Sequence, residues 1–183
     1  LIVGAGRSGI AAAKMLCSLG ESFVIFDGNE NLDIKAVSEK IKEGESFEFI
    51  LGKLSESQLD GIDVCVVSPG VPLDTEVMKT VASKGLEVWS EIELAYRYDK
   101  GTVLALTGTN GKTTTTSLVY DIVKAYTEKT LLVGNIEIPY TGLCLESSED
   151  SFTVAEISSF QLETMITFRP KVSAILNITP DHL

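Results

Sequence analysis

Basic residues are scarce in this sequence of 183 residues: 15 lysines and arginines stand against 26 aspartates and glutamates, for a net charge of −11. A nucleic-acid-binding protein needs a basic face to meet phosphates, so we expect no nucleic-acid partner. Long hydrophobic runs are also lacking. No stretch reaches the roughly 18 apolar residues of a membrane span, and no basic segment with an apolar core opens the sequence, so we expect no membrane partner and no secretory signal.

Cysteine is rare as well, and its spacing argues against two uses. Cys17, Cys65 and Cys144 are odd in number and far apart, which is typical of neither a disulfide framework nor a metal-binding motif. Such cysteines indicate a reducing compartment, so we expect buried, reduced thiols in a cytoplasmic protein. His182 is the one histidine.

The sequence does have enough apolar residues for a core. They make up 44% of the chain, and the length suits one or two domains. Short apolar runs alternate with longer helical patterns, which predicts an α/β fold with parallel sheets. Leu1 opens a strand directly before a glycine loop, and the sequence stops without a closing element. We therefore expect a fragment that lacks the extreme N-terminus and the C-terminal part.

The β-loop-α pattern restarts near residue 99. This predicts a Rossmann-like parallel-sheet domain over 1–98, followed by a truncated P-loop-type α/β ATPase domain over 99–183. In the first domain we expect strands at 1–3, 22–26, 47–50, 63–67 and 87–89, and helices at 10–19, 34–42, 75–84 and 91–98. In the second we expect strands at 102–106, 152–155 and 172–176, a helix at 112–126, and a loop through Gly134 and Asn135. Ser90 and Glu93 are predicted to form a capping box at the start of the helix over 91–98.

The first glycine loop, Gly4-x-Gly6-x-x-Gly9, follows a strand and opens a helix. Its glycines allow a tight turn, and backbone N–H groups at the helix N-terminus can approach a phosphate. Asp27 ends the next strand, where a dinucleotide-binding fold places a ribose-binding acid. The pattern favours a nucleotide-bearing ligand over a purely structural turn, without saying which nucleotide. Arg7 either reaches the phosphate or is solvated.

The second glycine loop runs from Thr107 to Thr113 and ends in Gly-Lys-Thr, the core of a P-loop. In such a loop backbone N–H groups surround phosphates, Lys112 places a charge at the β- and γ-phosphates, and the Thr113 hydroxyl binds Mg²⁺. Leu106 occupies the position of the usual first glycine, so the loop is a variant. The alternative is a threonine-capped helix with a chance lysine. Thr114 offers a further hydroxyl or simply faces solvent.

Several further polar positions are ambiguous on spacing alone. Glu156 follows a predicted strand and offers the carboxylate that a phosphate-bound Mg²⁺ needs, or is an exposed acid at a strand end. His182 is either a metal ligand or proton carrier, or a surface histidine. Asn135 is either functional or a turn residue. Ser68-Pro69-Gly70 lies at the end of a strand, where open α/β sheets bind ligands, but the tripeptide is also common in ordinary turns.

Taken in this order, the segments resemble the Mur ligase family. The loop from Thr107 to Thr113 is similar to that family's ATP loop, with the departure at Leu106 included. The run from Ala155 to Glu163 is similar to the signature of the member that adds D-glutamate, and the run from Asn177 to Leu183 resembles an Asn-x-x-x-Asp-His segment. The first glycine loop and Ser68-Pro69-Gly70 resemble the family's UDP-binding domain.

The resemblance implies ATP-dependent amide synthesis in cytoplasmic peptidoglycan assembly. ATP would phosphorylate the carboxylate of UDP-N-acetylmuramoyl-L-alanine, and the amine of D-glutamate would attack the acyl phosphate. ATP and Mg²⁺ would be the cofactors, the two small molecules the partners, and the protein a monomer. The fragment alone would be inactive, because a metal-bridging lysine and a D-glutamate-binding domain would lie beyond Leu183.

The resemblance also implies roles for individual residues. Lys112, Glu156 and His182 would be catalytic, and Thr113, Glu156 and His182 would bind metal. The ATP loop would consist of Gly108, Thr109, Asn110, Gly111, Lys112, Thr113 and Thr114. The nucleotide-sugar substrate would contact Arg7, Ser8, Asp27, Ser68, Gly70, Asn135, Ser158 and Gln161.

Two alternatives belong to other functional classes. An NAD-dependent oxidoreductase built on the first glycine loop would leave Gly111-Lys112-Thr113 unexplained. A non-catalytic nucleotide-binding module would use both loops for binding alone.

Overall fold

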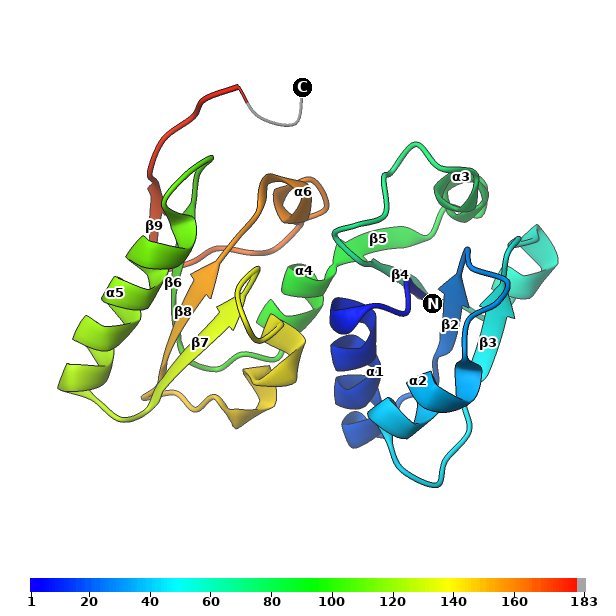
Figure 1. Ribbon diagram of the computed structural model, residues 1–183, viewed down its shortest axis with the longest axis horizontal. Coiled ribbons are helices and arrows are strands. Elements are labelled where there is room, and N and C mark those ends of the chain that lie inside the picture. Colours follow the sequence, from blue (N-terminus) through cyan, green and yellow to red (C-terminus); the bar gives the residue numbers. More distant parts are fainter. Residues whose placement is uncertain (181–183) are drawn as a thin grey trace.

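A computed structural model describes residues 1–180 and places two parallel β-sheets in two lobes (Figure 1). The first lobe holds a five-stranded sheet in the order β3-β2-β1-β4-β5, and the second a four-stranded sheet in the order β7-β8-β6-β9. The strands are β1 (Ile2–Val3), β2 (Val24–Asp27), β3 (Glu48–Leu51), β4 (Val64–Val67), β5 (Glu87–Ser90), β6 (Thr102–Thr107), β7 (Thr130–Gly134), β8 (Phe152–Glu156) and β9 (Val172–Ile175).

Helices cover the sheets and join the lobes. They are α1 (Arg7–Leu19), α2 (Ile34–Ile41), α3 (Glu76–Ser83), α4 (Glu91–Tyr96), α5 (Lys112–Tyr126) and α6 (Ser159–Leu162), with 3-10 turns at Glu56–Leu59, Tyr140–Gly142 and Cys144–Glu146. In the first sheet Ile2 packs with residues of α1 and α2, while its neighbour Val3 packs with residues of α3. The alternation of side chains along β1 therefore supplies a core on each face of the sheet.

The predicted α/β fold with parallel sheets is confirmed, since every strand pairing within residues 1–180 is parallel. β7 was expected to be a loop, and this was wrong. The Gly134-Asn135 pair indicated a turn, but Gly134 itself pairs with Glu156 and ends the strand. The prediction that α1 begins at residue 10 was also wrong, because the helix already begins at Arg7, inside the glycine loop.

The expected capping box at α4 forms only in part. The Ser90 side chain accepts a hydrogen bond from the Glu93 backbone N–H at 3.1 Å. The Glu93 carboxylate does not return to Ser90, because it is fully buried against the second lobe. The helix ends at Tyr96, two residues earlier than predicted.

The cysteines are free, as predicted. Cys65 and Cys144 are buried, whereas Cys17 is half-buried. Burial raises the pKa of the Cys65 thiol to about 11, which keeps it protonated and unreactive at neutral pH. Within residues 1–180, every helix is too short or too polar to cross a bilayer.

The three glycines of the first loop have different structural roles. Gly4 has a φ of +98°, a conformation that other residues rarely adopt. A Cβ atom on Gly9 would lie 1.8 Å from the carbonyl oxygen of Gly4, so glycine lets α1 pack against the loop. A Cβ on Gly6 would meet nothing within 4 Å. The open space at Gly6 is consistent with a ligand that approaches the backbone there.

This difference predicts contrasting effects of two alanine substitutions on stability. Gly9→Ala should lower the free energy of unfolding by about 2–3 kcal/mol, because the obstructing atom is backbone and cannot rotate away. Gly6→Ala should change it by less than about 0.5 kcal/mol. Urea denaturation of both variants measures this, and equal effects would contradict the assignment of roles.

Candidate nucleotide and substrate site

The second glycine loop lies between β6 and α5, as the sequence predicts. Gly111 precedes α5 with a φ of +79°, and Gly108 has a φ of +145°. The Lys112 ammonium group turns back over the loop and donates hydrogen bonds to the carbonyl oxygens of Gly108 at 2.7 Å and Thr109 at 3.0 Å. Its charge is thus held at the mouth of the loop, where phosphates would bind.

The chain after β9 closes one side of this loop. The Asn177 side chain accepts from the Asn110 N–H at 2.9 Å and donates to the Asn110 carbonyl at 2.8 Å. The Thr109 hydroxyl donates to the Thr179 carbonyl at 3.1 Å and accepts from the Thr179 N–H at 3.0 Å. Asn177 and Thr179 are absent from the predicted site, although both belong to the segment that resembles Asn-x-x-x-Asp-His. The predicted ligand His182 lies outside the described residues.

Glu156 ends β8 beside the loop. Strand register aligns it with Leu106 on one side and with Gly134 on the other. The alternative of an exposed acid is wrong, because Glu156 is only 1% exposed. Its Oε1 accepts a hydrogen bond from Asn135 at 3.2 Å, whereas Oε2 is buried without a partner among residues 1–180. Burying a carboxylate oxygen without a partner costs free energy, and a bound cation would offset that cost.

A cleft of about 650 Å³ joins this loop to the first lobe. Of the predicted site residues it is lined by Gly70, Gly108, Thr109, Lys112, Asn135 and Ser158. Pro69 and Gly70 therefore contribute to the same cleft as the P-loop, from the opposite lobe, whereas Ser68 does not line it. Thr113 and Thr114 are exposed on the first turn of α5.

Gln161 has a structural role that our sequence prediction missed, although Ser158-x-x-Gln161 matches the capping-box pattern. It is 2% exposed, and its side-chain oxygen accepts hydrogen bonds from the N–H of Ser158 at 2.9 Å and from the Ser158 hydroxyl at 3.0 Å. The Ser158 hydroxyl in turn accepts from the Gln161 N–H at 3.3 Å. Together they form a capping box that fixes the start of α6. Their contact with substrate remains a prediction.

The predicted residues of the first lobe lie at the carboxyl ends of adjacent strands. β1 lies between β2 and β4, where the strand order reverses, and open α/β sheets bind ligands at such a position. Asp27 accepts hydrogen bonds from the N–H groups of Ala5 at 2.8 Å and Asn29 at 2.9 Å, so it also shapes the glycine loop. Ser8 is half-buried on the first turn of α1.

Arg7 of the first lobe borders an open hollow between the two lobes. It lines this hollow of about 480 Å³ together with Thr113 and Asn135. Its guanidinium group is exposed and makes no ion pair within residues 1–180. A phosphate group between the lobes would therefore find both this cation and the loop of Lys112 on its borders.

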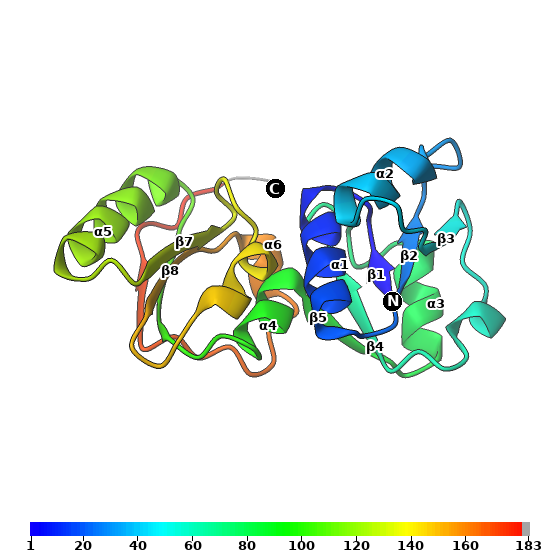
Figure 2. The same cartoon turned by 90° about the horizontal axis from the view of Figure 1, so that it is seen from below.

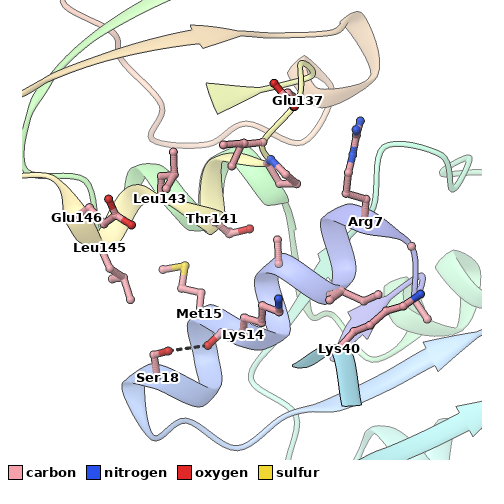
Figure 3. Close-up of a pocket in the computed structure, with 17 residues that line it drawn as sticks. Arg7, Lys14, Met15, Ser18, Lys40, Glu137, Thr141, Leu143, Leu145 and Glu146 are labelled. Atoms are coloured by element: carbon pink, nitrogen blue, oxygen red, sulfur yellow. Dashed lines mark hydrogen bonds between the residues drawn. The ribbon is translucent and has the colours of Figure 1, made fainter. Parts of the chain in front are cut away.

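A larger hollow lies elsewhere along the seam. A groove of about 770 Å³ runs between α1 and the segment 137–146 (Figure 3). Lys14 and Met15 lie on one side, and Thr141 and Leu143 on the other. Arg7 is the one predicted site residue that lines it. The chemistry of the P-loop, rather than the size of a hollow, therefore identifies the candidate site.

The seam itself contains buried carboxylates on α4, which lies between the lobes (Figure 2). Glu91 is 1% exposed, and its Oε1 accepts hydrogen bonds from the Thr141 N–H at 2.5 Å and the Thr141 hydroxyl at 2.7 Å. Its Oε2 is buried without a partner among the described residues. Burial raises the pKa of the Glu91 carboxyl to about 6, against the opposing effect of the Thr141 hydrogen bonds.

This shift predicts a pH-dependent effect of Glu91→Gln. Between pH 4.5 and about 6 the folded chain holds the proton that the unfolded chain releases, so the contribution of Glu91 to stability falls as pH rises. The neutral glutamine should therefore raise the free energy of unfolding at pH 7 by up to about 2 kcal/mol, with no gain near pH 4. Urea denaturation across this range measures the difference, and a difference independent of pH would contradict the prediction.

The fold and the loops define the class of the chain: an α/β protein with a P-loop-type Gly-Lys-Thr loop and a second glycine loop in a Rossmann-like lobe. Comparison with known families is specific. The model described as "Mur ligase MurD-like, N-terminal domain" matches residues 1–90, and "Mur ligase middle domain" matches residues 106–183. The chain belongs to the Mur ligase family. The second match includes the Gly-Lys-Thr loop, which the oxidoreductase alternative left unexplained.

Curated relatives agree with this assignment. A protein of Lachnospira eligens named UDP-N-acetylmuramoylalanine–D-glutamate ligase is 56% identical over 183 residues, which is 100% of this chain and 40% of the relative. A protein of the same name from Lachnoclostridium phytofermentans is 49% identical with the same coverage. The chain thus spans 40% of the length of these relatives.

Solved structures support the fold. The ligase MPL from Neisseria meningitides, which its title describes as UDP-N-acetylmuramate:L-alanyl-gamma-D-glutamyl-meso-diaminopimelate ligase, matches with a TM-score of 0.58 at 19% identity, over 99% of this chain and 60% of that one. A murein peptide ligase from Psychrobacter arcticus matches with a TM-score of 0.57 at 19% identity, over 98% of this chain and 43% of that one.

Proposed function

We propose that the protein containing this chain is an ADP-forming ligase that joins D-glutamate to UDP-N-acetylmuramoyl-L-alanine in peptidoglycan synthesis. The observation that carries the proposal is Glu156, a buried carboxylate with an unpartnered oxygen beside the Gly-Lys-Thr loop. The relatives' names support the choice of substrates. The Ser158–Gln161 segment, which begins two residues after Glu156, also supports it, because Ser158 lines the cleft.

The reaction needs activation because a carboxylate is a poor electrophile. A carboxylate oxygen of the muramoyl-alanine attacks the γ-phosphorus of ATP, the bond to ADP breaks, and an acyl phosphate forms. The amine of D-glutamate then attacks the acyl carbon, and phosphate leaves with the oxygen that bonded to phosphorus. Lys112 and the backbone N–H groups of its loop offset the negative charge that accumulates on the transferred phosphoryl group.

The residues present fit a phosphate-bound Mg²⁺. Thr113 offers a hydroxyl on the first turn of α5, and Glu156 offers its unpartnered oxygen from the neighbouring strand. Both are oxygen ligands, which Mg²⁺ prefers. When bound, the ion would neutralise charge on the β- and γ-phosphates. His182 would assist from the segment after β9, and this remains a proposal from the family resemblance.

The first lobe would hold the uridine nucleotide. Arg7, Ser8, Asp27, Ser68 and Gly70 surround the carboxyl ends of β1, β2 and β4. Asn135, Ser158 and Gln161 would face the muramoyl group across the cleft, where Asn135 and Ser158 line the same surface as Gly70. We also propose a monomer in the cytoplasm, where ATP and nucleotide sugars are available.

The experiment uses the complete reading frame that contains residues 1–183. Phosphate release is measured with ATP, Mg²⁺, UDP-N-acetylmuramoyl-L-alanine and D-glutamate, and again with each omitted in turn. The proposal expects release only with all four together. NADH binding without phosphate release would instead favour an oxidoreductase, and nucleotide binding without turnover would favour a binding module.

A further inference from the structure

The helix that joins the lobes holds a second buried carboxylate, Glu93, with no exposed surface. It accepts hydrogen bonds from three consecutive backbone N–H groups, those of Ile166 and Thr167 at 3.0 Å and of Phe168 at 3.1 Å. The Thr167 hydroxyl donates to it at 2.6 Å, and Arg97 donates at 2.9 Å. A single side chain of α4 thus fixes the backbone of a segment more than 70 residues later.

Neighbouring contacts hold the same segment. The Ser90 N–H donates to the Thr164 carbonyl at 3.4 Å, and the Tyr96 hydroxyl donates to the Arg169 carbonyl at 3.0 Å. The rings of Tyr96 and Phe168 meet edge to face with centroids 5.0 Å apart. Residues 166–169 are therefore attached to α4, and Thr164 to Ser90 at its N-terminus.

The attached segment connects the two parts of the second lobe that form the cleft. Before it comes α6, which begins at the Ser158–Gln161 capping box. After it comes β9, which leads to the Asn177 contacts with the P-loop. Residues 160–164 also line a small hollow together with residues 67–73 of the first lobe. The segment thus links α6, which follows Ser158 of the cleft, to β9 and the P-loop contacts of Asn177.

Glu93 remains ionised at neutral pH. Burial by itself raises the pKa of its carboxyl, but the hydrogen bonds from Thr167, Ile166 and Phe168 outweigh this effect, and the pKa lies below its usual value. Charge-assisted hydrogen bonds of this kind are stronger than those between neutral groups. The attachment of the segment to α4 therefore persists throughout the neutral pH range.

We propose that Glu93 is a positioning residue for the nucleotide-sugar site, which holds residues 158–168 so that Ser158 and Gln161 face the first lobe. The inference rests on the proposed function and adds to it a residue that does not touch the substrate. Its loss should weaken binding of the muramoyl substrate and leave ATP binding at the Gly-Lys-Thr loop nearly unchanged, because that loop lies between β6 and α5 and its partner Asn177 is held by the pairing of β9 with β6.

The test measures kcat of the Glu93→Gln variant of the complete protein, together with its KM for UDP-N-acetylmuramoyl-L-alanine and its KM for ATP. The glutamine keeps the size of the side chain but loses one acceptor oxygen and the charge. We expect KM for UDP-N-acetylmuramoyl-L-alanine to rise about tenfold and KM for ATP to change less than about twofold. Glu91→Gln is the matched control, since Glu91 is buried in the same helix but contacts Thr141, which lines the groove away from the cleft.

A second variant covers the case in which Glu93→Gln does not fold. Thr167→Val removes one hydrogen bond of 2.6 Å and leaves the backbone contacts in place, and we expect a rise of about twofold to fivefold in the same KM. Unchanged KM values in folded variants, or an equal rise in both KM values, would overturn the inference. Wild-type protein without turnover would instead overturn the proposed function itself.

Discussion

Replacing Lys112 by alanine should lower the rate of ATP-dependent ligation by about 10²–10³-fold. The ammonium group lies over the loop, 2.7 Å from the Gly108 carbonyl oxygen, and it is the cation that the loop itself supplies to the phosphates. Without it, the charge that would develop during phosphoryl transfer would be offset only by backbone N–H groups and, when bound, by Mg²⁺. The measurement is the steady-state rate of phosphate release by the complete protein with ATP, UDP-N-acetylmuramoyl-L-alanine and D-glutamate all saturating.

The matched control is Lys124→Ala on the same helix. Lys124 is exposed, and the contact it makes is with the Tyr120 side chain on the same helix. Its removal should change the rate by less than about twofold, because an exposed charge this far along α5 is screened from the loop. Equal losses in the two variants would show that α5 is merely perturbed, and an active Lys112→Ala enzyme would contradict the assignment of the ATP loop.

Glu156→Gln should reduce the rate by about 10²-fold or more and raise the Mg²⁺ concentration needed for half-maximal activity. The glutamine retains an oxygen toward Asn135 but removes the negative charge at the buried, unpartnered position. Because that charge is costly in the absence of a cation, the variant should be no less stable than the wild-type protein when Mg²⁺ is absent. Activity titrated with Mg²⁺ and urea denaturation in a chelator measure the two effects.

Glu146→Gln serves as the control, since Glu146 is an exposed acid of the second lobe that lines the groove along α1. It should leave both the rate and the Mg²⁺ requirement unchanged. A Glu156→Gln enzyme with a wild-type Mg²⁺ requirement would exclude Glu156 as a metal ligand. A large loss of stability instead would indicate that the carboxylate has a structural role at the end of β8.

The local units of the fold could be predicted from sequence because their signals are local. The helix after the second glycine loop has the predicted bounds, Lys112–Tyr126, and the strand before it differs by one residue. Glycine and proline mark the ends of such units, and apolar runs mark the strands between them. β7 escaped detection because the Gly134-Asn135 pair at its end indicated a loop, and its pairing to β8 depends on partners 22 residues further along the chain.

The parts of the site that could not be predicted depend on contacts between distant residues. Glu93 fits a capping box in sequence, yet its partners lie at residues 166–168. Glu156 could equally have been exposed, and only the packing of β8 between β6 and β7 shows that it is buried. Asn177 contacts the P-loop through β9, which no spacing rule connects to residue 110. The sequence thus indicates which functional groups are present, and the topology of the fold determines which of them come into contact.

The central claim is that ATP phosphorylates the carboxylate of the muramoyl substrate. Following one oxygen atom of that carboxylate tests it most directly. The complete protein would be supplied with UDP-N-acetylmuramoyl-L-alanine labelled with ¹⁸O in its terminal carboxylate, and the released phosphate examined by ³¹P NMR. If the carboxylate attacks the γ-phosphorus of ATP, each turnover transfers one labelled oxygen into inorganic phosphate. Phosphate free of label, with product formed, would contradict an acyl-phosphate mechanism and the function proposed for this site.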